Sequence, residues 1–320
     1  MKRRFALIST LCALFVLLFA SRRVIESCRY GLRLCVELIL PSLFPFFLIS
    51  ILLSRLGFPH LMGKILGPPA ARLFHVSGPG VTALFVGLTG GYPMGAAYLS
   101  ELLRNGLISV TEGERLLAFC NNSGPAFLVG AIGTGVFGSA RLGLQMYGVH
   151  ILAALLTGFL LRGRALPVSV TESLSENAGP SLSSLLPDAI QQSVTALLNV
   201  CGFVVCFSIF TGLLEASGLL DLGTRFVCSQ FSMDPSAVRA LLIGFWELGS
   251  GAGALRGLLP TPLHLASAAC LVGWGGLSVH FQTLAVLSDT EIKGALHTAG
   301  RLLNAVLSFF MMYVLSYLRN

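Results

Sequence analysis

The run Asn-Asn-Ser-Gly-Pro at residues 121–125 lies at the centre of Leu116–Val136, a segment without a charged residue. An apolar segment of this length predicts an element that spans a membrane. The bilayer core penalises unpaired amides, so two Asn side chains and a Pro at mid-depth need a specific role. We interpret the run as a break in a helix, whose freed backbone and side-chain groups face a ligand or a water path. The alternative is that the amides hold neighbouring helices together.

The composition indicates that the whole chain belongs to a membrane. Hydrophobic residues make up 54% of the 320 positions and charged residues only 11%, whereas soluble domains carry about 25% charged residues. The mean hydropathy is +0.82. We therefore expect an all-α polytopic membrane protein, with the lipid bilayer as a partner. The net charge of +7 is typical of Lys and Arg at membrane surfaces and predicts no nucleic-acid partner.

The sequence lacks the usual motifs of enzymes and metal sites. Its eight cysteines form no C-x-x-C pair and no metal-like spacing with His. The motifs H-E-x-x-H, G-x-S-x-G and Walker A do not occur, and Gly133–Gly138 matches G-x-G-x-x-G only at the end of an apolar segment. We expect no enzyme activity, no metal and no cofactor.

Nine hydrophobic segments are candidate spans, and several are interrupted by Gly or Pro. We therefore expect about eight or nine hydrophobic segments, some of them broken or re-entrant helices. Lys and Arg divide almost evenly between the two sides of such an arrangement, so the sequence predicts no orientation. The candidate segments are 5–20, 36–53, 81–99, 116–136, 142–161, 194–214, 237–257, 263–287 and 302–318.

A polar stretch divides the chain into two halves that resemble each other. Arg162–Asp188 is rich in Ser and Pro and cannot form a core. Three features recur about 160 positions later: the G-x-x-x-G pattern of 87–95 at 249–257, Arg141 as Arg301, and the break at 121–125 as 274–278. Duplicated halves with interrupted segments are typical of secondary transporters, and parallel and inverted repeats both remain open. The predicted boundaries are 1–30 for an N-terminal span and connector, 31–161 for the first repeat, 162–189 for a linker and 190–320 for the second repeat.

The first interrupted segment, Thr89–Gly95, contains Gly91 and Tyr92 before a Pro. Gly permits a positive φ, and Pro starts a new helix readily. A helix that begins there would direct free N–H groups and a positive dipole into the membrane, which suits an anion. The alternative is close helix packing through the G-x-x-x-G face. The amides of Asn121 and Asn122 would add donors and acceptors for a carboxylate or a ring nitrogen.

Glu247 is an acidic residue inside a predicted span, which indicates a functional role. We predict that it carries a coupling proton or pairs with a cation. The alternative is a buried ion pair with Arg301 or Arg141 from another span.

The segment Trp274–Gln282 combines a Gly-Gly break with Ser278, His280 and Gln282. His titrates near neutral pH in water, so His280 is a second candidate for proton coupling. A structural, hydrogen-bonded His is the alternative. Arg301 is predicted to supply positive charge to the same cavity or to extend toward the membrane surface.

Three strings carry a resemblance to a known family: Gly91-Tyr92-Pro93, residues 119–127 and residues 275–282. They look like the YlbJ sporulation integral membrane proteins, which belong to the wider nucleoside-recognition, or Gate, class. The resemblance runs in order from about residue 30 to 315. It implies a multi-pass protein of the bacterial cell membrane, with the outer forespore membrane as one location. It also implies two Gate-type units and a role in moving dipicolinic acid toward the forespore.

Our first hypothesis is a secondary transporter or facilitator for a small organic anion, with dipicolinate as the substrate that the resemblance implies. The alternatives are a nucleoside or nucleobase transporter, and a spore-envelope scaffold or sensor that transports nothing. A homo-oligomer is compatible with all three. Glu247 and His280 are the candidates for proton coupling. The predicted substrate-binding residues are Gly91, Tyr92, Asn121, Asn122, Ser123, Gly124, Ser278, Gln282 and Arg301.

Overall fold

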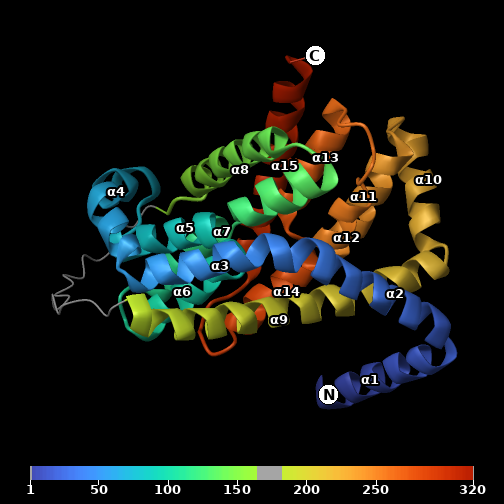
Figure 1. Cartoon of the computed structure of the whole chain (residues 1–320), viewed down its shortest axis with the longest axis horizontal. Coiled ribbons are helices and arrows are strands. Elements are labelled where there is room, and N and C mark those ends of the chain that lie inside the picture. The colour runs from blue at the N-terminus through green and yellow to red at the C-terminus, as the bar shows by residue number, and fades with distance from the viewer. Residues whose placement is uncertain (1, 164–181, 320) are drawn as a thin grey trace.

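The computed structural model describes residues 2–163 and 182–319, and within these ranges every element of secondary structure is a helix, as expected (Figure 1). Pro residues and Gly-rich breaks divide it into many short helices between a few long ones. In chain order the elements are α1 Lys2–Phe19, α2 Ser21–Leu34, η1 Cys35–Ile39, α3 Leu40–Arg55, α4 Phe58–Phe74, α5 Gly78–Gly90, α6 Met94–Arg104, α7 Val110–Cys120, η2 Ala126–Val136, α8 Ala140–Leu160, α9 Leu182–Ala216, α10 Leu219–Phe231, α11 Pro235–Trp246, α12 Leu248–Gly253, α13 Pro262–Trp274, α14 Gly276–Val286 and α15 Ala295–Tyr317.

Five described helices are long and apolar enough to cross a membrane, and a sixth span results if one bent pair is counted. The protein is therefore a multi-pass membrane protein. The expected eight or nine hydrophobic segments are not confirmed as full-length spans, because three of them are divided at their interruptions. Segment 81–99 is divided into α5 and α6, 116–136 into parts of α7 and η2, and 237–257 into α11 and α12. Segment 263–287 is also interrupted, between α13 and α14, but still counts as one of the five spans.

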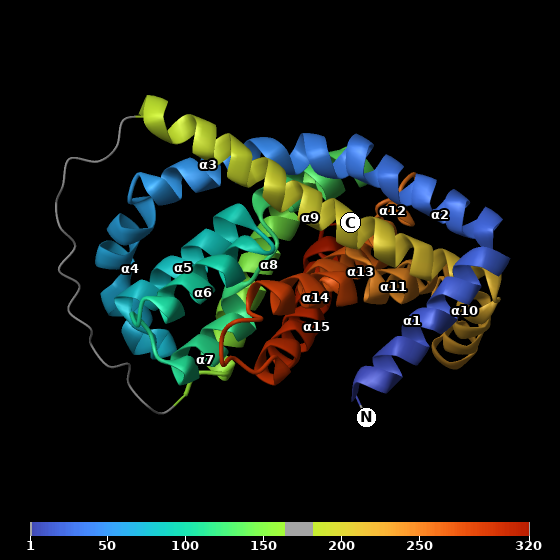
Figure 2. The ribbon, with the colours of Figure 1, turned by 90° about the horizontal axis from the view of Figure 1, so that it is seen from below.

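Two long apolar helices run side by side along one face of the molecule (Figures 1 and 2). One is the continuous helix Ser21–Arg55, which comprises α2, η1 and α3, and the other is α9; each has 35 residues. At about 1.5 Å per residue both exceed the roughly 30 Å hydrocarbon core of a bilayer. Gly31 permits their close approach, because a Cβ there would lie 3.0 Å from the Ser208 side chain.

The start of α9 corrects the predicted linker. We expected polar, unpacked chain over Arg162–Asp188, but residues 182–188 form the first turns of α9. The reason is packing, since Leu185 contacts the apolar cluster formed by Ile51, Leu52 and Ala189. Residues 164–181 of the predicted linker lie outside the described ranges.

A sharp bend separates α4 from α5. Residues Leu61–Phe74 and Gly78–Gly90 form one apolar pair bent by 99°, which makes it a broken span or a re-entrant hairpin. The bend is fixed by the buried Glu112 of α7, whose carboxylate accepts a hydrogen bond of 2.6 Å from the Ser77 amide. The hydroxyl of Ser77 in turn caps the first turn of α5 at Gly80. The sequence analysis did not assign α4 to the membrane.

Candidate functional site

Four helix breaks surround a small internal cavity. They lie between α5 and α6, between α7 and η2, between α11 and α12, and between α13 and α14. The cavity has a volume of ≈ 50 Å³. Seven of the predicted site residues line it: Gly91, Tyr92, Ser123, Gly124, Glu247, Ser278 and Gln282. Aliphatic and aromatic side chains complete the wall: Ile39, Leu43, Phe127, Val200, Val204, Leu248 and Val279.

Glycines allow the breaks to meet backbone against backbone. Gly91 has φ +80°, and a Cβ on it would lie 2.8 Å from the backbone nitrogen of Gly124. Gly276 has φ +76°, and a Cβ on it would lie 2.9 Å from the backbone nitrogen of Leu248. In the first half, the break after α5 therefore packs against the break after α7. In the second half, the break after α13 packs against the break after α11. Only Gly permits this separation.

The amides of the Asn121–Pro125 run are buried in protein contacts. Asn121 donates a hydrogen bond of 2.8 Å through Nδ2 to the Thr283 hydroxyl of α14. Asn122 donates one of 2.6 Å through Nδ2 to the backbone carbonyl of Phe119. Both Asn side chains are fully buried and lie outside the cavity wall. In this conformation they connect the break to its surroundings, while Asn121 Oδ1 has no hydrogen-bond partner.

Arg301 is a fully buried cation that joins the two halves of the chain. Its Nη1 donates to the Asn121 carbonyl and to Asn122 Oδ1, both at 3.0 Å. Its Nη2 donates to the Tyr92 hydroxyl at 2.7 Å and to the carbonyls of Val272 and Gly273. The two carbonyls belong to the last turn of α13, where a cation is favourable for the helix dipole. Since the protein occupies all the Nη protons, only Nε remains without a partner.

Glu247 forms the cap of α12 and faces the cavity. Its carboxylate accepts a hydrogen bond of 2.8 Å from the Gly249 amide and another from the Ser250 amide. The residue is 1% exposed. Across the part of the chain that the structure describes, no ion pair joins Glu247 to Arg301 or Arg141, so the alternative of a buried pair is not observed.

Two cavity-lining hydroxyls lack a partner. Ser123 lies in the break of the first half and Ser278 in the first turn of α14, and both are about 1% exposed. Neither hydroxyl makes a hydrogen bond within the protein. Buried polar groups are usually satisfied, so two unpaired hydroxyls beside the cavity are candidates to bond a solute once the wall opens. Gln282 lines the wall one turn after Ser278.

His280 lies away from the cavity wall. Its ring packs between the rings of Trp274 and His297, with centroid distances of 4.3 and 4.9 Å. Its Nε2 is buried without a partner. The structure thus separates the two coupling candidates, because Glu247 borders the cavity and His280 lies outside its wall, in contact with the tilted rings of Trp274 and His297.

Two residues that support the site were missed by the sequence analysis. Thr283 accepts the hydrogen bond from Asn121, and His150 accepts one of 3.1 Å from the backbone nitrogen of Ser123. His150 is 2% exposed in the middle of α8. A polar ring inside a predicted span was a usable signal. Thr283 gave none, because a Thr in a membrane helix commonly bonds its own backbone, as it also does here to Val279.

Comparison with known proteins identifies the family. No protein-family model matches the chain, and no solved structure matches it. The sporulation integral membrane protein YlbJ of Bacillus subtilis (strain 168) is 32% identical to it, over 88% of this chain and 74% of that protein. The chain belongs to the family of YlbJ sporulation integral membrane proteins.

Proposed function

We propose that this protein is a secondary transporter or facilitator of a small organic anion, with dipicolinate as the substrate during sporulation. The observation that carries the proposal is the cavity at the meeting point of four helix breaks, with one unpaired hydroxyl from each half in its wall. Interrupted helices around a central site are the usual design of secondary transporters. We assign the protein no catalytic chemistry.

We also propose that the halves are copies of one Gate-type unit. Each unit begins with a long helix and a left-handed Gly, Gly57 at φ +81° and Gly218 at φ +75°. A short helix follows and ends at a left-handed residue, His75 at φ 55° and Ser232 at φ 50°. Such non-Gly conformations are uncommon. Their repetition at the same step of the element order supports duplication more strongly than the recurrence of small apolar residues does.

An anion in this cavity meets both favourable and unfavourable charge. The first turns of η2 and α14 begin at the breaks, and helix N-termini attract negative charge. The Glu247 carboxylate lines the same space and repels an anion while it is ionised. We therefore propose that a proton on Glu247 accompanies the anion, which makes Glu247 the coupling residue.

The cavity is too small for the proposed substrate in this conformation. A volume of ≈ 50 Å³ holds a few waters, since each needs at least about 10–15 Å³ of such space. An aromatic ring with two carboxylates requires several times this space. Binding therefore needs the wall to open, as alternating access does.

A nucleoside or nucleobase is the second candidate substrate. The observation that favours it is the pairing of a carboxylate, Glu247, with a carboxamide, Gln282, in one wall. Both groups bind hydroxyl and amino groups of neutral solutes, and an ionised Glu247 repels no neutral solute.

Uptake by the purified protein in proteoliposomes tests the proposal. We expect accumulation of labelled dipicolinate that excess nucleoside does not inhibit. Ser278→Ala should lower uptake at least about fivefold, because one hydrogen bond contributes about 1 kcal/mol. Ser100→Ala is the matched control, since Ser100 is also buried and unpaired but lies outside the cavity. Inhibition by nucleosides would favour the second candidate, and absence of any uptake would favour a scaffold or sensor.

A further inference from the structure

A second, larger cleft lies between α2, α9, α11 and α12. Its volume is ≈ 650 Å³. Charged and hydroxyl side chains dominate its lining, in contrast to the aliphatic wall of the central cavity. The polar residues that line it are Arg23, Glu26, Ser27, Tyr30, Ser208, Thr211, Glu215, Arg239 and Ser250. Polar and ionisable residues at membrane depth mark solute or proton paths.

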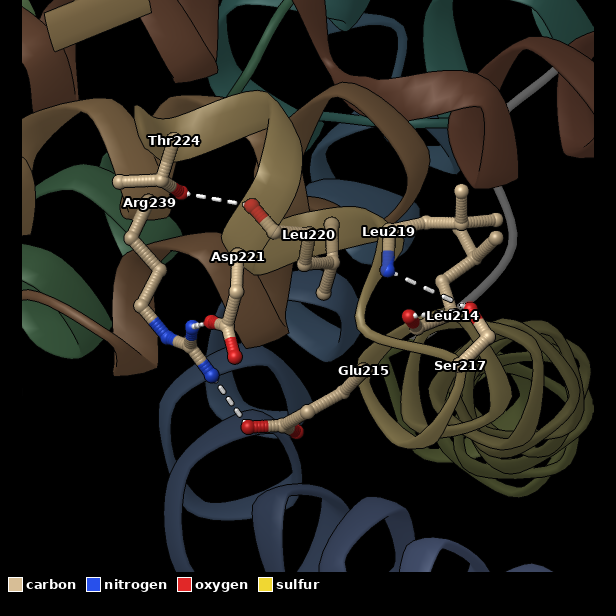
Figure 3. Close-up of polar contacts among 8 residues, drawn as sticks. All are labelled: Leu214, Glu215, Ser217, Leu219, Leu220, Asp221, Thr224 and Arg239. Atoms are coloured by element: carbon tan, nitrogen blue, oxygen red, sulfur yellow. Dashed lines mark hydrogen bonds and ion pairs between the residues drawn. The ribbon is translucent and has the colours of Figure 1, made fainter. Parts of the chain in front are cut away.

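Ion pairs surround the outer end of the cleft. Arg239 of α11 pairs with Asp221 of α10 at 2.7 Å and with Glu215 at the end of α9 (Figure 3). On the opposite side, Arg23 of α2 pairs with Glu26 at 3.3 Å. The side chains of Arg23, Glu26, Glu215 and Asp221 are well exposed. Charged side chains of this exposure belong at a membrane surface, so this end of the cleft faces water.

The inner end of the cleft reaches the cap of α12. The hydroxyls of Ser208 and Ser250 lie 3.2 Å apart, and each residue is 2% exposed. Ser250 also donates its backbone N–H to the Glu247 carboxylate. Glu247 and Gly249 line the central cavity on the other side. The α12 cap is thus a thin partition, with the polar cleft on one side and the central cavity on the other.

We propose that this cleft is a water-filled access path through which protons reach Glu247 from the membrane face that carries Arg239. Water fills the space from the Arg239 ion pairs to the Ser208 and Ser250 hydroxyls, and the proton that Glu247 gains or loses passes through this water. The exposed ion pairs lie at one end of the cleft, so we expect protons to exchange with one side of the membrane only. This inference rests on the proposed role of Glu247 as the coupling residue, and it does not depend on which solute the central cavity binds.

Cysteine accessibility tests the path directly. In a full-length chain whose native cysteines are replaced, Ser208→Cys and Thr211→Cys should react with a charged, membrane-impermeant thiosulfonate from one face of oriented vesicles. The matched control keeps only the native Cys206, which lies two residues from Ser208 on the same helix, is exposed and does not line the cleft. A thiol that faces lipid does not ionise readily and should react at least about tenfold more slowly.

A second measurement uses the unmodified protein, in case the cysteine replacements disturb folding. Hydroxyl-radical labelling followed by mass spectrometry oxidises side chains that contact water. Tyr30 lines the cleft, whereas Phe310 of α15 is 62% exposed and lies outside the cleft. Tyr30 should be oxidised and Phe310 should be protected by lipid.

Equal labelling at 206 and 208, or protection of Tyr30, would overturn the access path. Labelling at 208 from both faces would overturn its single entrance. Neither readout requires transport. Labelling of the cleft in a protein that takes up no solute would therefore refute the proposed function and leave the access path intact.

Discussion

Replacing Arg301 with Gln distinguishes a structural cation from a substrate-binding one. Three buried acceptors lose their donor in this variant: the Asn121 carbonyl, Asn122 Oδ1 and the Gly273 carbonyl. The Tyr92 hydroxyl stays satisfied, because it donates to the Val272 carbonyl at 2.8 Å. The shorter Gln carboxamide can restore one donor at most, so two acceptors remain unpaired.

The magnitude follows from these two acceptors. Each buried unsatisfied group costs about 1–3 kcal/mol, so the loss is about 2–6 kcal/mol before the relief of a buried charge offsets part of it. Even about 2 kcal/mol changes the ratio of folded to unfolded protein about 30-fold. We therefore expect Arg301→Gln to lower thermal stability clearly, whether or not a solute is present.

The assay is the fraction of protein that stays monodisperse in detergent after heating, compared with uptake in proteoliposomes. Arg319→Gln is the control, because Arg319 is exposed and bonds only the Gln145 side chain among the described contacts. An Arg301→Gln protein with wild-type stability and no uptake would refute the structural argument. The guanidinium would then bind the substrate, as the sequence analysis predicted.

Three further predictions concern packing, the site and pH. Gly87→Ala should prevent folding, because a Cβ would lie 1.6 Å from the Cys120 carbonyl oxygen, whereas Gly148→Ala in open space should be neutral or stabilising in a thermal assay. Asn121→Ala should lower the dipicolinate content of spores while the protein stays in the membrane, because the break loses its bond to α14; loss of the protein itself would support the packing alternative. A hydrogen bond from Ser236 lowers the pKa of Asp234 in the folded protein. The ionised carboxylate therefore stabilises the fold fully above the unfolded pKa of about 3.9, and this contribution is lost as the pH falls through the folded pKa. The stability difference between wild type and Asp234→Ala should accordingly shrink below about pH 4, and a constant difference from pH 7 to 3 would contradict this cause.

Local chemistry explains which parts of the fold the sequence could predict. The breaks at Gly91 and at residues 121–125 follow from residues that cannot continue a helix in the usual way, Gly with positive φ and Pro without a donor. The number of full spans does not follow from hydropathy, because α5 and α6 together are as apolar as a straight helix. The bend between α4 and α5 depends on Glu112, which is distant in sequence from Ser77.

The assignment of roles within the site required the tertiary structure. Asn121, Asn122 and Arg301 attracted attention as polar residues in apolar segments, but hydropathy cannot tell a group that faces a cavity from one that faces a carbonyl. Residue 301 meets residues 121 and 122 only because α15 packs against α7, where Gly300 lies against Ala118. Glu247 and Ser278, chosen by the same criterion, line the cavity. The criterion therefore selected residues around the same helix breaks, but it did not separate those that line the cavity from those that bind neighbouring helices.

The difference between these two groups of residues indicates where the cavity can open. The hydrogen bonds of the buried Arg301 connect the breaks of the two halves. Separating the halves would break these bonds, at a high cost in free energy. The opposite wall is formed by Leu43 of α3 and by Val200 and Val204 of α9, which contribute aliphatic side chains to the cavity. Aliphatic surfaces have no directional bonds and can repack after a shift. In the proposed mechanism, movement of the paired long helices relative to the breaks would thus open the cavity without breaking the hydrogen bonds of Arg301. It would also change the polar cleft, because α9 borders both spaces. In the proposed transport mechanism, a single displacement of α9 would in this way couple access of the solute to access of the proton at Glu247.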